Sequence, residues 1–547
     1  MLKLSRMLIV ASGMVFVLLF AAVPSHAVVL SGVVTDQTDH PLSGVWVTAK
    51  NLDRKMAVSV LTDPRGRYRI QSLFPGTYRL RVHAIGYEPL EVEDLTLAEQ
   101  GASRAFRLSQ TTDIGAQMPA DAWLGSLPQG EYKANFVVGC TICHAFGTPV
   151  THRPRSADEW VGVIERMRHK IDVYSVIPNF DEHELALWLV GNGFGPDSKP
   201  RHFIAPPPPA GIAARVVVTE YDIGKPNTWA HDMAVEPSTG MAWVGDYFND
   251  VLVRVDPTNG VQKIYPVPVK NSGVHTLQFD RQGTLWMTLQ LSDMVVSFDP
   301  KTAHFRVYKG FRKGSLIHSF AYDPFGYIQY DAHGRIWMSE FGGNAVASLE
   351  PKSGQIKEYD TAHRGHPYGI ALDQKGRIWY TDYSGNWLGM IDPESGHATD
   401  QAMPHKNSGP HRMTIDAHDR LWIPESGYGR LAMYDIAKKT FVEYNLPDPD
   451  TFPYSLRVDG ATGAVWICGD GADSLYRFDP TTRKFTTVRL PAQDSYTRMV
   501  SLDYASGDVW TAISSFPNSH TSHPEHGELV RVHIPGHPGG SEQAVAQ

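Results

Sequence analysis

The sequence contains little cysteine, with three residues in 547. A disulfide framework or a four-cysteine zinc site needs more thiols, so neither can be the basis of the fold. Charge is also modest: charged residues make up 20% of the chain, and the net charge is −8. Because there is no basic excess and no run of like charge, the sequence gives no indication of nucleic-acid binding.

Long apolar runs are missing after the N-terminus. Residues 1–27 combine the basic residues Lys3 and Arg6, an apolar stretch at 7–22 and a small-x-small sequence that ends at Ala27. This order is typical of a secretory signal peptide. An uncleaved anchor helix is disfavoured because the apolar stretch is short for a membrane span. We therefore expect a periplasmic or secreted protein with no membrane span after signal cleavage.

Two of the three cysteines lie close together, in the sequence Cys140-Thr-Ile-Cys143-His144. This Cys-x-x-Cys-His pattern is that of covalent haem c attachment, in which two thiols bind the porphyrin and the adjacent imidazole binds the iron. A redox-active cysteine pair and a zinc half-site are the alternatives. The pattern predicts haem c bound by Cys140, Cys143 and His144, with His144 as an iron ligand. It also predicts electron transfer to or from a periplasmic redox partner protein.

Residues 116–200 predict a small helical domain around this pattern. Ser156 and Glu159 form a capping box, and apolar residues follow at helical spacing as far as Met167. A second helix is predicted at 181–190. This order of motif and helices resembles a small class I-like cytochrome c, and the resemblance implies Met167 as the distal ligand of the haem iron. An open distal site is one alternative. The alternative distal ligands are His152, His169 and His183.

Residues 28–110 alternate apolar and polar positions between turn sequences, which predicts the short strands of a β-sandwich. The phrases G-V-V-T-D, T-D-P-R-G-R-Y-R-I and L-F-P-G-T-Y-R-L resemble the carboxypeptidase regulatory-like family. The resemblance implies a non-catalytic sandwich with a carbohydrate-binding-like fold, so a peptide or glycan is one candidate ligand. The proline-rich residues 204–213 are expected to form a semi-rigid linker.

Residues 214–535 contain a seven-fold repeat in which an acidic turn and a strand end at a tryptophan. Successive tryptophans are 43, 51, 42, 43, 44 and 44 residues apart. Repeats of this length with about four short strands indicate a seven-bladed β-propeller. A strand at 216–221 is expected to complete the last blade and so remove an exposed edge. Residues 536–547 are expected to form a disordered tail. The seven tryptophans that end the repeats are Trp243, Trp286, Trp337, Trp379, Trp422, Trp466 and Trp510.

Two recurring positions are expected to face the central channel. A water-filled channel is commonly lined by polar residues, so most of these side chains need no functional role. His411 and Glu425 belong to one repeat, and together they could act as base and acid or bind a divalent ion. The position five residues before each turn acid holds His231, His275, Gly326, Tyr368, His411, Tyr454 and Arg498. The position three residues after the tryptophan includes Asp246, Glu340, Asp382 and Glu425.

The phrases G-P-H-R-M-T-I-D-A-H-D-R-L-W-I-P-E and H-P-Y-G-I-A-L-D-Q-K-G-R-I-W-Y-T-D resemble the virginiamycin B lyase (streptogramin lyase) family. The resemblance implies a seven-bladed propeller that opens a cyclic depsipeptide at an ester by elimination, with Mg²⁺ and a histidine base. By position, His411 would be the catalytic base and Glu425 a metal-associated acid. The chain departs from the family at Gly409, where active members have glutamate, and at Tyr368, where a second functional histidine is expected.

The sequence therefore predicts a multidomain, mainly β protein with a β-sandwich, a small α-helical cytochrome c domain and a seven-bladed β-propeller. Its principal predicted function is haem c electron transfer, with a propeller that binds a substrate or partner. The first alternative is a metal-assisted C–O lyase acting on a cyclic ester. The second is a non-catalytic scaffold that binds a small molecule, a peptide or a glycan.

Overall fold

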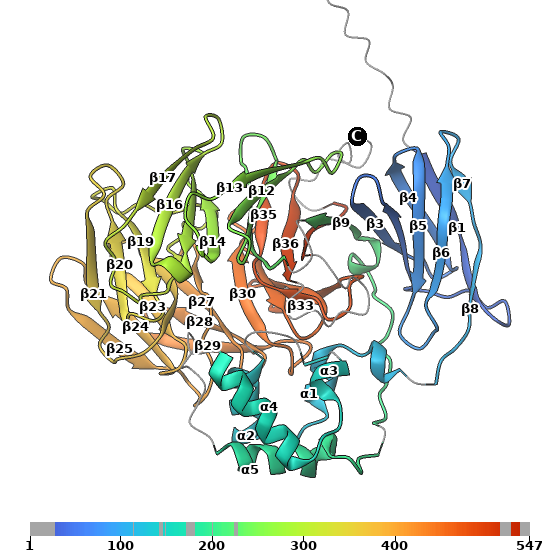
Figure 1. Ribbon diagram of the computed structural model, residues 1–547, viewed down its shortest axis with the longest axis horizontal. Helices are drawn as coiled ribbons and strands as arrows, with labels where there is room; N and C mark the ends of the chain where they lie inside the picture. The colour runs from blue at the N-terminus through green and yellow to red at the C-terminus, as the bar shows by residue number, and fades with distance from the viewer. Residues whose placement is uncertain are drawn as a thin grey trace, which may run out of the picture.

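The computed structural model describes residues 28–536 apart from 113, 142–145, 148, 171–180, 200, 224–227 and 515–526. The predicted signal peptide, and the predicted tail beyond residue 536, lie outside the described residues. Within the described ranges, no helix is long and apolar enough to cross a membrane. The chain is mainly β with few helices, and its strands form propeller blades (Figure 1). The mainly β propeller that the sequence predicted is thus confirmed.

Six four-stranded antiparallel sheets follow one another along the chain, and each is built from consecutive strands. The first three are β10 (Ala230–Val235), β11 (Ala242–Asp246), β12 (Val251–Val255) and β13 (Gln262–Pro266); β14 (Val274–Phe279), β15 (Leu285–Leu289), β16 (Met294–Asp299) and β17 (His304–Tyr308); and β18 (Ile317–Phe320), β19 (Ile336–Glu340), β20 (Ala345–Leu349) and β21 (Ile356–Asp360). The next three are β22 (Pro367–Leu372), β23 (Ile378–Asp382), β24 (Trp387–Ile391) and β25 (Ala398–Ala402); β26 (Thr414–Ile415), β27 (Arg420–Glu425), β28 (Arg430–Asp435) and β29 (Thr440–Asn445); and β30 (Pro453–Val458), β31 (Val465–Gly469), β32 (Ser474–Asp479) and β33 (Lys484–Arg489).

Burial changes from the inside of each blade to its outside. The first strands β10, β14, β22 and β30 are buried along their whole length, whereas the fourth strands β13 and β25 consist mainly of half-buried and exposed residues. The acidic turn of each repeat is held by hydrogen bonds. In the fourth blade the Asp373 carboxylate accepts from the Trp379 indole at 2.9 Å and from the backbone amides of Lys375 and Arg377 at 2.9 and 3.0 Å. The recurring acid and tryptophan of the sequence are therefore two ends of one turn-closing contact.

The seventh blade is closed by a strand from the start of the repeat region, as the sequence indicated. β9 (Val217–Ile223) pairs antiparallel with the last strand, β37 (Gly527–His533), from Ile223 opposite Gly527 to Val217 opposite His533. The other strands of this blade are β34 (Tyr496–Thr497), β35 (Ser501–Asp503) and β36 (Asp508–Ser514). The outer edge of β9 is also occupied, because it pairs with β3 (Met56–Leu61) of the N-terminal module. One nine-stranded sheet therefore joins the two parts of the chain and leaves β9 with no free edge.

The N-terminal module contains two sheets with a shared apolar core. The core includes Leu30 and Ile70 from one sheet and Val47 and Leu80 from the other, all fully buried. The first sheet consists of β1 (Val28–Asp36), β4 (Arg67–Leu73), β7 (Ala102–Ser103) and β8 (Phe106–Leu108). The second consists of β3, β2 (Trp46–Asn51), β5 (Gly76–His83) and β6 (Leu90–Leu97).

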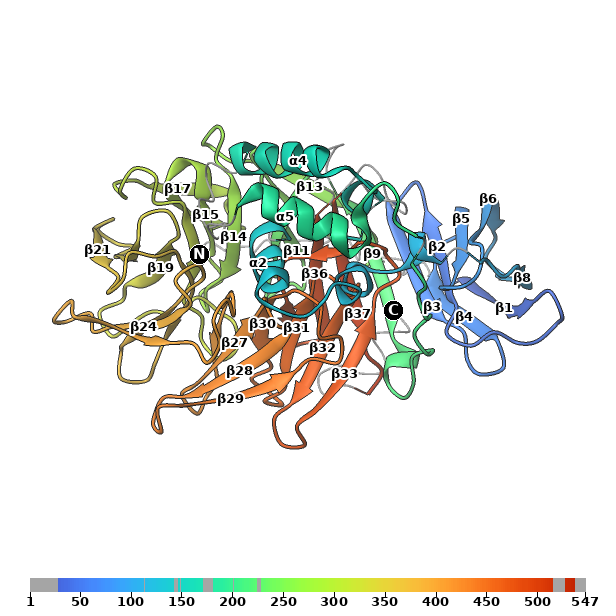
Figure 2. The same cartoon turned by 90° about the horizontal axis from the view of Figure 1, so that it is seen from below.

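A helical segment lies over one end of the propeller (Figures 1 and 2). The capping box is formed as predicted, because the Glu159 amide donates to Ser156 Oγ at 3.2 Å and the Ser156 amide donates to the Glu159 carboxylate at 2.8 Å. Trp160 and Ile164 are buried on the inner face of that helix. The helices are α1 (Ala120–Gly125), α2 (Glu131–Cys140), α3 (Pro149–His152), α4 (Ala157–Lys170) and α5 (Glu182–Leu189).

Candidate functional site in the propeller channel

Seven side chains, one from each blade, meet in the channel of the propeller. Neighbouring rings lie close together: the ring centroids of His231 and His275 are 3.8 Å apart, and those of Tyr368 and His411 are 4.6 Å apart. Five of the seven residues occupy the second position of the innermost strand, which is why one strand pattern brings them to the same level. The members of this ring are His231, His275, His318, Tyr368, His411, Tyr454 and Arg498.

The structure corrects one of the predicted channel residues, because His318 occupies the place that was assigned to Gly326. The third blade has two acidic turns, at Asp323 and Asp331, and counting back five residues from the wrong turn led to Gly326. The innermost strand β18 ends before Asp323. The spacing of 51 residues in this repeat, against 42 to 44 elsewhere, was the signal of an inserted turn.

His411 is fully buried and fixed in orientation. Its Nδ1 forms a short hydrogen bond with Ser426 Oγ, and that hydroxyl also donates to the Pro453 carbonyl at 2.8 Å. The Tyr383 ring stacks on the imidazole, with a centroid distance of 4.4 Å. The Nε2 atom is enclosed and has no hydrogen-bond partner among the described residues. The sequence did not indicate Ser426, because only the fold shows which residue of β27 and its following turn faces His411.

Burial controls the protonation of the four histidines among these seven channel residues. It lowers the pKa of His411 well below its usual range, and the positive charges of Arg412 and Arg498 act in the same direction. Burial is also the main cause that lowers the pKa values of His231, His275 and His318, and the charge of Arg412 acts in the same direction on each. All four imidazoles are therefore neutral at pH 7, the state in which an imidazole can accept a proton. The Tyr368 and Tyr454 hydroxyls hydrogen-bond to each other at 2.6 Å beside His411.

A buried ion pair crosses the channel near the ring. The Arg412 Nη1 atom, from the fifth blade, lies 2.6 Å from a carboxylate oxygen of Asp232, in the first blade. Both side chains are buried. Arg412 Nη2 also donates to Thr276 at 3.2 Å, so the guanidinium links three blades. Because a buried charge is costly without its partner, this pair requires both residues to be present.

Glu425 lies on the strand beside His411, but the two side chains do not meet. No hydrogen bond or ion pair joins them among the described residues, and Ser426 contacts His411 instead. The Glu425 carboxylate is fully buried beside Glu443, and burial together with that second carboxylate raises its pKa to about 8. The predicted convergence of His411 and Glu425 is not seen.

The described side chains do not fit the predicted magnesium site. No group of three or more His, Cys, Asp or Glu side chains that could hold a metal ion occurs among them. The other acids of the second recurring position have their own contacts. Asp246 accepts from Asn249 at 2.8 Å, Glu340 from Ser315 at 3.1 Å, and Asp382 from the His366 amide at 2.8 Å.

The end of α2 covers the mouth of the channel above His411. The Tyr383 hydroxyl donates to the Val138 carbonyl at 2.6 Å, and the Tyr496 hydroxyl donates to the Thr141 carbonyl at 2.6 Å. Val138 packs against Gly409 so closely that a Cβ atom added there would lie 2.9 Å from its side chain. The glycine at 409, where the resembling family has glutamate, is thus what allows α2 to approach. We call residues 131–141 the lid.

The residues assigned to haem are only partly described. Cys140 is half-buried at the end of α2, whereas Cys143 and His144 lie outside the described residues. Met167 is half-buried on α4. His152 stacks on Trp123 with a centroid distance of 3.6 Å, and burial lowers its pKa to about 4. His183 is exposed on α5, and the side chain of His169 lies outside the described part. The third cysteine, Cys468, is fully buried.

Comparisons with known proteins identify the propeller. The virginiamycin B lyase family matches residues 218–434 and 363–515, which together span more than half of the chain. The carboxypeptidase regulatory-like domain family matches residues 29–109. A comparison with curated proteins gave no match.

Solved structures show the same fold. A streptogramin B lyase structure is 18% identical, covers 59% of this chain and 100% of its own, and has a TM-score of 0.51. Virginiamycin B lyase from Staphylococcus aureus, in selenomethionine form, is 19% identical, with 58% and 100% covered and a TM-score of 0.50. A catalytically inactive histidine-to-alanine form of that enzyme with quinupristin gives the same identity, coverage and TM-score.

These findings correct the principal functional prediction. The matched families account for residues 29–109 and 218–515 and leave the Cys-x-x-Cys-His segment outside both. Among the described side chains, no group of three or more His, Cys, Asp or Glu that could hold a metal ion occurs. The streptogramin B lyase and virginiamycin B lyase structures share the fold of the propeller. The interpretation as a haem c electron-transfer protein is therefore contradicted; it depended on a five-residue pattern and on the order of the helices around it. The chain belongs to the virginiamycin B lyase family.

Proposed function

We propose that the propeller is a C–O lyase that opens an ester by elimination, with His411 as the base. The proposal rests on the hydrogen bonding of His411: its Nδ1 is held by Ser426, and its Nε2 has no partner among the described residues. A neutral imidazole with one nitrogen fixed and the other unoccupied is what a general base requires. Membership of the lyase family supports this assignment.

The chemistry follows from the position of the base. His411 Nε2 removes a proton from the carbon next to the substrate carbonyl, and the electron pair of that C–H bond becomes part of a C=C bond. The C–O bond of the ester then breaks, and its oxygen leaves with the carboxylate. The rings of Tyr368 and Tyr454 pack beside the His411 imidazole, and their hydroxyls are suited to donate to the enolate oxygen that forms. No step passes through a metal ion.

The lid determines access to this base. His411 has no exposed surface while α2 covers the channel, so a substrate reaches it only when the lid moves. The contacts that hold the lid include two tyrosine hydroxyls, the packing of Val138 on Gly409 and an ion pair between the buried Lys133 and Asp450. We propose an exported enzyme whose substrate is a constrained ester, such as a cyclic depsipeptide, admitted when the lid opens.

A second candidate function is a non-catalytic propeller that binds a small molecule, a peptide or a glycan. The filled channel favours it, since the seven ring side chains stack on one another and leave His411 enclosed. The replacement of a family glutamate by Gly409 favours it as well. Under this function the lid contacts would be permanent parts of the fold.

The two functions are separated by product analysis with the full chain. Incubation with quinupristin, followed by mass spectrometry, should give a linear product of unchanged mass, because elimination adds no water. Hydrolysis would add the mass of one water molecule. The His411→Ala variant should lose this activity, whereas His418→Ala, an exposed histidine in the same blade, should keep it. The Tyr383→Phe/Tyr496→Phe variant should react faster. If neither the native chain nor this lid variant opens the ring, the lyase proposal fails.

A further inference from the structure

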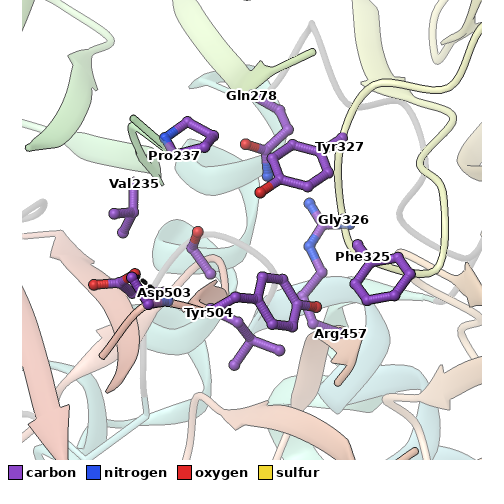
Figure 3. A pocket seen from close by; sticks show the side chains of 12 residues that line it. Val235, Pro237, Gln278, Phe325, Gly326, Tyr327, Arg457, Asp503 and Tyr504 are labelled. Atoms are coloured by element: carbon purple, nitrogen blue, oxygen red, sulfur yellow. Dashed lines mark hydrogen bonds between the residues drawn. The ribbon is translucent and has the colours of Figure 1, made fainter. Parts of the chain in front are cut away.

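A pocket lies at the end of the channel opposite the lid. The ring residues His231 and Tyr454 are near the beginnings of β10 and β30, whereas Val235 and Arg457 are near the ends of the same strands. Arg457 is three residues, or roughly 10 Å, further along β30 than the ring. The pocket is a cavity of about 50 Å³, and the inserted turn of the third blade forms one of its walls (Figure 3).

Arg457 forms the floor of this pocket without a counter-charge. It is only 3% exposed, and its Nε and Nη2 atoms have no hydrogen-bond partner among the described residues. Figure 3 shows its side chain directed toward Gln278 and Tyr327. One face of the guanidinium is covered, because its central carbon lies 3.7 Å from the centre of the Tyr322 ring. A buried guanidinium without an acceptor is costly, so a partner is expected.

The acids around Arg457 are engaged elsewhere. Asp503 lines the pocket, but its carboxylate accepts from the Ala505 amide at 3.0 Å and from the Ser506 hydroxyl at 2.7 Å. Asp323 is paired with Arg281 at 2.5 Å. Further inside, Asp232 is held by Arg412. Within the described part of the chain, no carboxylate forms an ion pair with Arg457.

We propose that this pocket binds the carboxylate group of a small organic acid, with Arg457 as its principal ligand. The cavity has room for a few water molecules or one small oxyanion, but not for a folded peptide. A carboxylate is planar like a guanidinium and carries the opposite charge. Arg281, which is paired with Asp323, lies over the Phe325 and Tyr327 rings at the rim.

The rim indicates what the rest of the ligand is. Phe325 is 41% exposed and packs edge-on against Tyr504, with a centroid distance of 5.6 Å. An aromatic surface beside a buried cation suits a carboxylate that carries an apolar or aromatic group. We therefore expect benzoate to bind more tightly than acetate, because its ring can contact Phe325 and Tyr504.

The test is thermal denaturation of the full chain in acetate, benzoate, sulfate or chloride at matched ionic strength. Acetate and benzoate should raise the melting temperature saturably, with half-saturation at a lower concentration for benzoate. Arg457→Gln should abolish the effect, and Arg306→Gln, an exposed arginine on the second blade, should leave it unchanged. Equal stabilisation by sulfate would overturn the assignment to a carboxylate. The site itself would be overturned if each salt changed the melting temperature of the native chain and of Arg457→Gln by the same amount.

A second variant keeps the proposal testable if Arg457→Gln does not fold. Gln278→Glu places a carboxylate in the pocket wall with little change of shape, so it should stabilise the chain in chloride and remove the response to acetate. An unchanged response to acetate in this variant would count against the site. His411→Ala should retain the full response, because the pocket and the proposed catalytic base lie at opposite ends of the channel.

Discussion

The enclosed carboxyl group of Glu425 makes the stability of the propeller depend on pH. Burial and the neighbouring Glu443 raise its pKa from 4.5 to about 8, so the folded chain retains a proton that the unfolded chain releases above pH 4.5. The folded state then binds more protons than the unfolded state, and stability falls as the pH rises from 4.5 to 8. The Glu425→Gln variant remains neutral and should lack this loss.

The size of the effect follows from the two pKa values. Each pKa unit corresponds to about 1.4 kcal/mol, so the full difference corresponds to at most about 5 kcal/mol. Relative to the native chain, Glu425→Gln should gain stability progressively between pH 5 and pH 8.5. The gain should be small at pH 5, where both proteins carry a neutral side chain at this position.

Urea denaturation followed by tryptophan fluorescence at several pH values measures this difference, because the anchor tryptophans lie in the blades. Glu394→Gln removes a carboxylate whose side chain is 73% exposed and should show no comparable pH-dependent gain. A difference between native chain and Glu425→Gln that stays constant within about 1 kcal/mol over this pH range would refute the reasoning. Added Mg²⁺ should not change the result, and stabilisation of the native chain alone by Mg²⁺ would show that Glu425 binds the metal.

Other contacts give further predictions. Tyr383→Phe and Tyr496→Phe each remove one hydrogen bond to the lid, worth about 1 kcal/mol, so amide exchange in residues 131–141 should become about fivefold faster in each; unchanged exchange would exclude a role of these hydroxyls in closure. Asp232→Asn leaves Arg412 buried without its counter-charge and should lower the free energy of unfolding by about 3–5 kcal/mol in urea denaturation, whereas a loss below about 1 kcal/mol would contradict the ion pair. Asp373→Ala removes the acceptor of the fourth turn and should cost about 2 kcal/mol in the same assay, while an unchanged unfolding midpoint would speak against the turn-closing contact.

Much of the fold was readable from neighbouring residues. The seven tryptophans, the acidic turns and the capping box at Ser156 and Glu159 depend on interactions within a few residues, so their spacing in the sequence carries the information. The strand that closes the ring was also predictable, since the last repeat lacks an outer strand and the segment before the first repeat supplies one. The Cys-x-x-Cys-His pattern misled because its meaning depends on a cofactor that five residues cannot establish.

The candidate site was predicted only in part. His411 was predicted from its place in the repeat, but its hydrogen-bond partner is Ser426, in the turn that follows β27, rather than Glu425. His318 was missed because an inserted turn changed the count in the third blade. The sequence by itself determined the blades, their order and the place of His411 in the channel. Only the tertiary structure decided that α2 covers His411 and that Arg457 is enclosed without a counter-ion, because these features arise from contacts between segments far apart in the chain, such as Val138 with Tyr383.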